Sequence, residues 1–431
     1  MGHTLIEKII MRNTGDESVK PGMIKTVHVD RVMIHDIFIP FVVDKFKEMG
    51  FRKVWDADKV VLIYDHLVPT SAVEDVRHFQ IGDAFVKEQG LKNFHRADGI
   101  CHQLMPEMGY ALPGNIVFGT DSHTTTYGCV GCFSSGIGYT EMASILGTGD
   151  MWIRVPETIK VVVNGKLPKG VHSKDIILRL IGDLRADGAT YKVLEFSGSC
   201  IDDMSVSARM TMSNMAIEAG AKAALFAPDE KTCEFSKVKM EDVDWLYADE
   251  DAQYCQTITY NAEELVPVLA CPSQVDNIKD VSTQVGTKLD QVFIGSCTNG
   301  RISDMEAAEN ARQTLIRDIN SIDFSSVEDE DLLPIIFVNS AIWAKNQQLE
   351  NQCADILFYI VNKWPTFVPG LILYSDFAFE SNKKRTEDSE MLNLRNAGIF
   401  SKEMELYDSR RKIPLSDALY RIEKALKESQ N

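Results

Sequence analysis

Four short polar motifs in this chain of 431 residues combine side chains that can transfer protons or bind a metal. Three of them contain a histidine: YDHLVP at 64–69, ICHQLMPE at 100–107 and GTDSHTTTYG at 119–128. The fourth, FIGSCTNGRISD at 293–304, carries Cys297 in a Gly-Ser-Cys-Thr-Asn loop. Imidazole and carboxylate groups are the usual general acids and bases, and a thiolate is a nucleophile or a metal ligand. The motifs therefore predict acid–base chemistry beside one reactive or metal-binding thiol.

Asp65-His66 and His102 each leave two interpretations open. A carboxylate near an imidazole can fix its tautomer and raise its basicity, which suits proton transfer. Neighbours on a strand point to opposite faces, however, so Asp65 and His66 need not bond each other and can be a surface pair in a turn. His102 lies between Cys101 and the polar run QLMPE. A lone histidine of this kind is also compatible with a hydrogen-bonded structural role.

The loop Asp121-Ser122-His123 is a denser cluster, followed by three threonines and Tyr127-Gly128. It offers hydrogen-bond donors and acid–base groups to an oxygen-rich substrate. The alternative is a turn network that caps a following helix. A Ser-His-Asp hydrolase is not indicated, because the chain has no Gly-x-Ser-x-Gly nucleophile motif.

Glu195 and three cysteines are further candidates. Glu195 is the single charge in the apolar run YKVLEFSGS, so it either faces solvent by alternation or is buried for a purpose. Cys129 and Cys132 have the spacing of a metal or redox pair, but their glycine-rich flanks favour small packing residues. Cys297 is the best ligand candidate, with an activated nucleophile and a structural thiol as alternatives.

Apolar runs that end in polar loops predict an α/β fold. Because open α/β sheets carry their sites at the carboxyl ends of strands, this pattern positions the motifs together. The Asn-Gly after the third predicted strand is typical of a hairpin turn. The predicted strands are 58–66, 115–121, 158–168 and 288–299, and the predicted helices are 138–152 and 303–319.

The composition predicts a soluble globular protein of the cytosol. The formal net charge of −18 disfavours binding to nucleic acids, and no stretch is apolar enough to span a membrane. The amino-terminal residues lack the apolar core of a signal peptide. Nine cysteines at irregular spacing do not form a disulfide framework.

Taken in order, the motifs resemble the 3-isopropylmalate dehydratase large-subunit branch of the aconitase family, including dimethylmalate dehydratase and homoaconitase-like relatives. The resemblance begins at MGHTLIEKI, continues through VKPG and HVDRVMIHD, and runs to about residue 312. It implies a three-domain α/β large subunit, with domains at 1–157, 158–275 and 276–431. The third domain is family-like to about 312 and atypical afterwards.

The resemblance also implies roles for individual residues. Asp65 and His66 match the pair that helps protonate the leaving hydroxyl. His102 and Glu195 resemble a second acid–base and hydrogen-bonding pair. Asp121 and His123 match the loop that contacts the cluster-bound water and the substrate. The remaining implied roles are substrate binding by His35, Asp36 and Ser122, and ligation of a cluster by Cys297.

The function implied is that of an iron–sulfur hydro-lyase of leucine biosynthesis acting on a branched hydroxy dicarboxylate, with a [4Fe-4S] cluster and a partner small subunit. The family holds that cluster with two further cysteines in a Cys-x-x-Cys after the Cys297 loop. Here Cys353, in ENQCADIL, is the only later cysteine, and its context does not match. A non-catalytic, truncated or frameshifted homologue is therefore the alternative. An RNA-binding relative is disfavoured by the negative charge.

Overall fold

The computed structural model of the protein describes residues 2–289 and 291–320. The chain divides into two units, Met1–Ala307 and Ala308–Asn431. All of the strands that the structure describes belong to the first unit. The atypical segment predicted after residue 312 lies, from residue 321 onward, outside the described residues, and so does Cys353.

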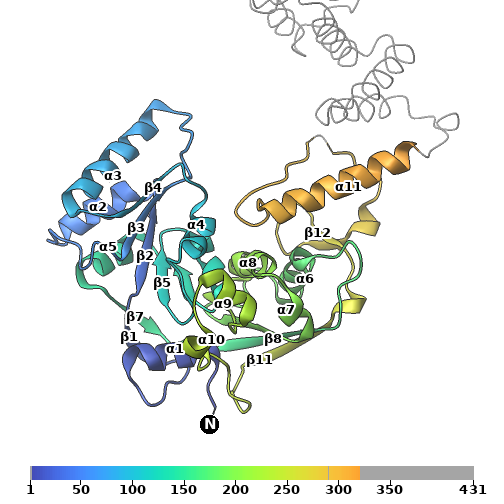
Figure 1. Ribbon diagram of the computed structural model, residues 1–431, viewed down its shortest axis with the longest axis horizontal. Helices are drawn as coiled ribbons and strands as arrows, with labels where there is room; N and C mark the ends of the chain where they lie inside the picture. Colours follow the sequence, from blue (N-terminus) through green and yellow to red (C-terminus); the bar gives the residue numbers. More distant parts are fainter. Residues whose placement is uncertain (1, 290, 321–431) are drawn as a thin grey trace, which may run out of the picture. The chain divides into compact units, whose positions relative to one another are not determined.

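The first sheet is parallel and five-stranded, in the order β4-β3-β2-β5-β6 (Figure 1). The chain builds it outward from β2, first to one side through β3 and β4 and then to the other through β5 and β6. The direction of winding therefore reverses at β2, which is where α/β sheets open a crevice at the carboxyl ends of their strands. The strands are β2 (Arg31–His35), β3 (Val60–Tyr64), β4 (Asn93–Arg96), β5 (Ile116–Gly119) and β6 (Phe133–Gly136).

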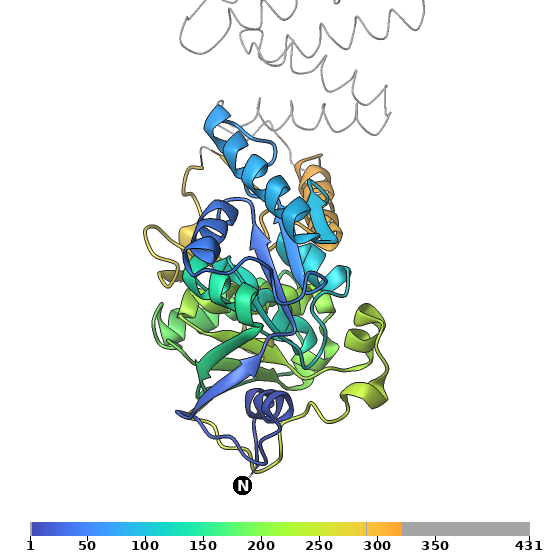
Figure 2. The ribbon, with the colours of Figure 1, turned by 90° about the vertical axis from the view of Figure 1, so that its left-hand side faces the viewer.

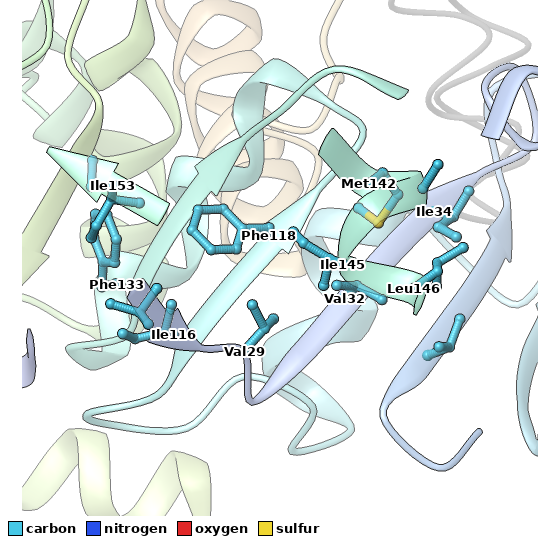
Figure 3. Close-up of a cluster of buried hydrophobic side chains, with 14 of the residues drawn as sticks. Val29, Val32, Ile34, Ile116, Phe118, Phe133, Met142, Ile145, Leu146 and Ile153 are labelled. Atoms are coloured by element: carbon cyan, nitrogen blue, oxygen red, sulfur yellow. The ribbon is translucent and has the colours of Figure 1, made fainter. Parts of the chain in front are cut away.

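Both faces of this sheet are buried, which explains why its strands are almost continuously apolar. Val32 and Ile34 point into a core that they share with Met142 and Leu146 of α5 (Figure 3). Met33, between them, points into a second core on the opposite face. The helices that follow these strands are α2 (Ile39–Glu48), α3 (Val76–Gln89), α4 (Cys101–Glu107) and α5 (Tyr139–Thr148).

The second sheet is also parallel, in the order β10-β9-β8-β11, and has its own core. Its strands are β8 (Thr158–Asn164), β9 (Val193–Ser197), β10 (Ala223–Phe226) and β11 (Gln256–Asn261). The helices that follow β8, β9 and β10 are α6 (Ser173–Leu184), α7 (Ser199–Asp203), α8 (Val206–Asn214), α9 (Glu230–Ser236) and α10 (Met240–Val243).

Smaller elements complete the described chain. Helix α1 (Leu5–Thr14) lies next to β1 (Ile24–His28), close to the amino terminus in both views (Figure 1, Figure 2). Strand β1 pairs antiparallel with β7 (Asp150–Arg154), and β12 (Val268–Ala270) pairs antiparallel with β13 (Ile278–Asp280). The 3-10 helices are η1 (Val73–Asp75), η2 (Ser122–Val130), η3 (Met215–Ala219), η4 (Ala262–Glu264) and η5 (Val281–Gln284), and the last described helix is α11 (Ile302–Asn320).

Five of the six predicted elements are confirmed, whereas the strand predicted at 288–299 and the hairpin turn are wrong. β3, β5, β8, α5 and α11 lie where the sequence places them. The Asn164-Gly165 turn makes no hairpin, because β8 pairs in parallel with β9 and β11 on its two edges. Residues 291–294 form no strand in the described part of the chain, and Val292 and Phe293 are 71% and 79% exposed. An apolar run becomes a strand only where a neighbouring strand pairs with it, and no described segment does so here.

No helix within the described ranges is long and apolar enough to cross a membrane. Cys129 and Cys132 are fully buried, which confirms their prediction as packing residues.

Helix η2 joins the two sheets, since it packs against both α8 and β10. The approach of η2 to β10 is so close that position 128 has no room for a side chain, and glycine meets this requirement. A Cβ atom at Gly128 would lie 1.6 Å from the carbonyl oxygen of Ala224 in β10.

We expect Gly128→Ala to lower the free energy of unfolding by about 3 kcal/mol or more, because the added methyl overlaps backbone that cannot move aside cheaply. Gly170→Ala is the control, since Gly170 has open space around it but a φ of +87°. We expect Gly170→Ala to lower the free energy of unfolding by about 1–2 kcal/mol, because alanine is strained in this left-handed backbone conformation. Urea denaturation of both variants measures the difference, and an equal loss would contradict the close packing of η2 on β10.

Candidate active site

Three adjacent strands deliver the candidate residues to one edge of the first sheet. His35 is the last residue of β2, Asp65 and His66 directly follow β3, and Asp121 follows β5. Because β3 and β5 flank β2, their carboxyl ends meet where the winding reverses. The strand-end pattern in the sequence therefore leads to one site.

Asp121 is the centre of this site. Its Oδ1 accepts hydrogen bonds from Nε2 of His102, at 2.7 Å, and from the backbone N–H of His123, at 2.8 Å. Its Oδ2 lies 3.3 Å from Nε2 of His66. The bond to His123 N caps η2, so the helix-capping alternative for this loop is also present. One carboxylate thus caps a helix and links two imidazoles.

His66 lies between two carboxylates. Its Nδ1 is 2.7 Å from Oδ1 of Asp65, and the other oxygen of Asp65 accepts the backbone N–H of Cys101 at 2.6 Å. Asp65 and His66 bond each other because they lie past the end of β3, where strand alternation no longer separates neighbours. The His66 side chain is 29% exposed, so it can reach a ligand.

His102 and His123 complete the ring of imidazoles around Asp121. His102 is buried in the first turn of α4, with Nδ1 3.4 Å from the hydroxyl of Tyr127. His123 has Nε2 3.4 Å from Oε1 of Glu218 and Nδ1 3.2 Å from the hydroxyl of Ser122.

Glu218 lies in η3 and was not identified from the sequence. The signal was present, since Glu218 is a lone acid in the apolar run NMAIEAG.

His35 and Asp36 lie behind His66. The His35 ring stacks on the His66 ring, with centroids 4.0 Å apart and planes at 21°. Asp36 is fully buried, and its two oxygens accept the backbone N–H groups of His66, at 3.2 Å, and of Leu67, at 2.8 Å. Both residues therefore hold the His66 loop in place.

These contacts shift the pKa values of the site. Hydrogen bonds to Asp121 and then to Asp65 raise the pKa of His66 to about 10. Hydrogen bonds to Asp121 and Glu218 likewise raise the pKa of His123 to about 10.

The pKa values of Asp121 and His102 are both lowered. Burial opposes the ionisation of Asp121, but hydrogen bonds from His102 and His123 outweigh it and hold the pKa of Asp121 well below its usual range. Burial lowers the pKa of His102, although Asp121 acts in the opposite direction. These shifts favour the charged forms of His66, His123 and Asp121 and the neutral form of His102.

The structure does not bring Glu195 to this cluster. Its carboxylate accepts the hydroxyl of Tyr254 at 2.6 Å and the backbone N–H of Leu5 at 3.0 Å. Glu195 thus accepts a hydrogen bond from the amino terminus of α1, which accounts for a buried acid in the second sheet. Glu218 takes the place beside the histidines that the sequence suggested for Glu195.

The buried side chain of Asn214, in α8, contacts both Cys297 and the histidine loop. The Asn214 side-chain N–H donates to Oγ1 of Thr126 at 2.9 Å and approaches Sγ of Cys297 at 3.5 Å. The hydroxyl of Thr298 donates to Oδ1 of Asn214 at 2.9 Å. Cys297 also lines a cavity of about 800 Å³ with Gln103, Lys231 and Arg301.

The described residues do not fit a cluster held by three thiolates. None of the described groups of three metal-binding side chains contains more than one cysteine. Cys129, within η2, and Cys132, just after it, are fully buried, and Cys101 is buried at the start of α4. The sequence after Cys297 offers Cys353 alone.

Comparison with known proteins identifies the family of the chain. The sequence model of the aconitase family (aconitate hydratase) matches residues 7–318. The chain is 45% identical over 311 residues to the probable 3-isopropylmalate dehydratase large subunit of Methanothermobacter thermautotrophicus, covering 72% of this chain and 74% of that one. It is 44% identical over 310 residues to 3-isopropylmalate dehydratase large subunit 1 of Methanopyrus kandleri, with the same coverage. A large subunit of that name from Sulfurihydrogenibium sp. is 43% identical over 311 residues, covering 72% of each chain.

We expect Glu218→Gln to lower the pKa of His123, because the substitution removes a carboxylate that stabilises the imidazolium. The imidazole signals of labelled protein, followed by NMR over a pH titration, measure this value. Glu195→Gln is the matched control and should leave His123 unchanged. The same shift in both variants would contradict the pairing of His123 with Glu218.

We expect Asn214→Ala to cost about 2 kcal/mol of stability, because buried polar partners lose their hydrogen bonds. Asn93→Ala, at an exposed hydrogen bond, should cost less than about 0.5 kcal/mol. Alkylation of Cys297, measured by mass spectrometry, should become faster only in the Asn214 variant. Unchanged alkylation would show that Asn214 does not restrain the Cys297 loop.

Proposed function

We propose that this chain, which belongs to the aconitase family, is the large subunit of a hydro-lyase acting on a branched hydroxy dicarboxylate such as 3-isopropylmalate. The observation that carries the proposal is the histidine–carboxylate cluster centred on Asp121. The names of the relatives support the reaction and the substrate class.

The first task of such an enzyme is to turn a poor leaving group into a good one. Hydroxide leaves a carbon atom readily only when it is protonated and departs as water. His66 suits this task, because Asp65 and Asp121 hold it as a partly exposed imidazolium. We assign the proton on Nε2 of His66 to the departing hydroxyl oxygen, with Asp121 orienting the ring.

The second task is to bind a dianion. His123 is also held as an imidazolium and lies beside the exposed hydroxyl of Ser122. We assign these two groups to one substrate carboxylate. His35 and Asp36, which are almost fully buried, we assign to positioning His66.

A partner chain completes the proposal. The relatives are named as large subunits. The family resemblance places the base that removes the carbon-bound proton on a separate small subunit. We therefore propose that turnover requires that partner. A non-catalytic homologue is the second candidate, favoured by the single cysteine after Cys297.

We expect the chain, combined with its small subunit, to dehydrate 3-isopropylmalate, measured by the ultraviolet absorbance of the unsaturated product. Asp65→Asn and His123→Ala should each lower the rate by about 100-fold or more without unfolding the protein. His28→Gln, at an exposed His28–Asp150 pair, should leave the rate unchanged.

Iron and acid-labile sulfide, measured per chain after anaerobic reconstitution, separate the two candidates. About four of each would show a complete cluster with ligands beyond those described. Near zero of each, together with no turnover, would establish the non-catalytic homologue. Normal activity in either active-site variant would contradict the assigned roles.

A further inference from the structure

The ends of β2, β3 and β5 bring two imidazoles and a carboxylate to one point. One metal-binding atom from each of His35, His66 and Asp121 lies within 4.8 Å of the other two. His35 is 2% exposed, and its Nδ1 lies 3.8 Å from Oδ1 of Asp36 but has no hydrogen-bond partner within the described residues. Burying a polar ring atom without a hydrogen bond costs free energy, so this atom in such a group indicates a missing ligand.

We propose that His35, His66 and Asp121 bind a single divalent transition-metal ion, without any cysteine ligand. Two imidazoles and one carboxylate form a donor set that such ions accept, and it leaves coordination positions open. The partial exposure of His66 and Asp121 provides access from solvent. The ion comes from the Fe²⁺, Co²⁺ and Zn²⁺ class, because imidazole ligands select against Mg²⁺ and Ca²⁺.

The neighbouring residues orient the ligands as they do around protein metal sites. Asp65 accepts a hydrogen bond from Nδ1 of His66, which leaves Nε2 as its ligand atom. His102 and the backbone of His123 bond Oδ1 of Asp121, so Oδ2 is the oxygen that faces His66. These bonds hold two of the three ligands in place before an ion arrives.

A second group, Asp65, His66 and Cys101, is also close enough to bind a metal, but it is less suitable. Asp65 already accepts hydrogen bonds from both His66 and Cys101. Cys101 is fully buried, and burial raises the pKa of its thiol, which disfavours the thiolate that a metal requires. Cys297 belongs to neither group.

An ion at this position has a consequence that rests on the proposed function. It would bind Nε2 of His66 in place of the proton that we assign to the leaving hydroxyl, and that proton would pass to solvent. Metal binding and proton donation at that atom exclude each other. Zn²⁺ or Co²⁺ should therefore inhibit dehydration, which makes the site a point of metal regulation.

Titration of the chelator-treated full chain with Co²⁺ tests the binding. We expect one ion per chain and a visible cobalt spectrum without the charge-transfer band of a thiolate ligand. His35→Gln and His66→Gln should each weaken binding at least tenfold, as should Asp65→Asn through the orientation of His66. Thermal melting of each variant establishes that it is folded.

The controls are His28→Gln, at an exposed histidine paired with Asp150, and Cys297→Ser, and both should bind Co²⁺ like the unaltered chain. Absence of binding, binding that survives His35→Gln and His66→Gln, or a thiolate band would each overturn the site. These outcomes leave the proposed function intact, because it does not require the ion. Tight binding with no effect of Co²⁺ on turnover would instead overturn the assignment of His66 as the acid.

Discussion

The Asp121 carboxylate is the interaction on which the rest of this site depends. It contacts the imidazoles of His66, His102 and His123, which come from three different segments. It also caps the helix that connects the two sheets. Hydrogen bonds to the charged form keep Asp121 ionised, and this carboxylate orients His102 and, together with Asp65 and Glu218, raises the pKa values of His66 and His123. Local folding and acid–base chemistry thus share one carboxylate.

The second sheet contributes to the site through contact with η2. Gly128 allows β10 to approach η2, while α8 and η3 supply Asn214 and Glu218. Asn214 reaches Thr126 on one side and Thr298 on the other, so it connects the histidine loop to the Cys297 loop. A side chain that no motif identified therefore connects the acid–base groups to the candidate metal ligand.

The described chain contains the histidines and carboxylates that the family resemblance predicts, but not three cysteines for a cluster. His66, His102 and His123 are each held by a carboxylate in the described chain. Among the described cysteines, Cys297 alone is the one that the family resemblance predicts as a cluster ligand. Histidine and carboxylate groups recur in both candidate metal groups of the described structure, and a single thiol, that of Cys101, occurs in one of them.

The sequence by itself determined the α/β class, the family and the positions of β3, β5, β8, α5 and α11. These follow from local periodicity and from the motifs at strand ends, which a short segment carries on its own. It also placed His66, His102, Asp121 and His123 in a common site, because adjacent parallel strands end at the same edge of a sheet.

Only the tertiary structure decided between the two candidate acids, Glu195 and Glu218. Both are single charges in apolar runs, and local sequence does not distinguish them. Packing of the second sheet brings Glu195 to the amino terminus of α1 and Glu218 to His123. Packing of whole elements also explains the Asn164-Gly165 turn. Its sequence is typical of a hairpin, but β8 pairs in parallel with β9 and β11 on its two edges, so no hairpin forms. Partners that lie far apart in the chain are chosen by how whole elements pack, and that choice is not encoded in any one segment.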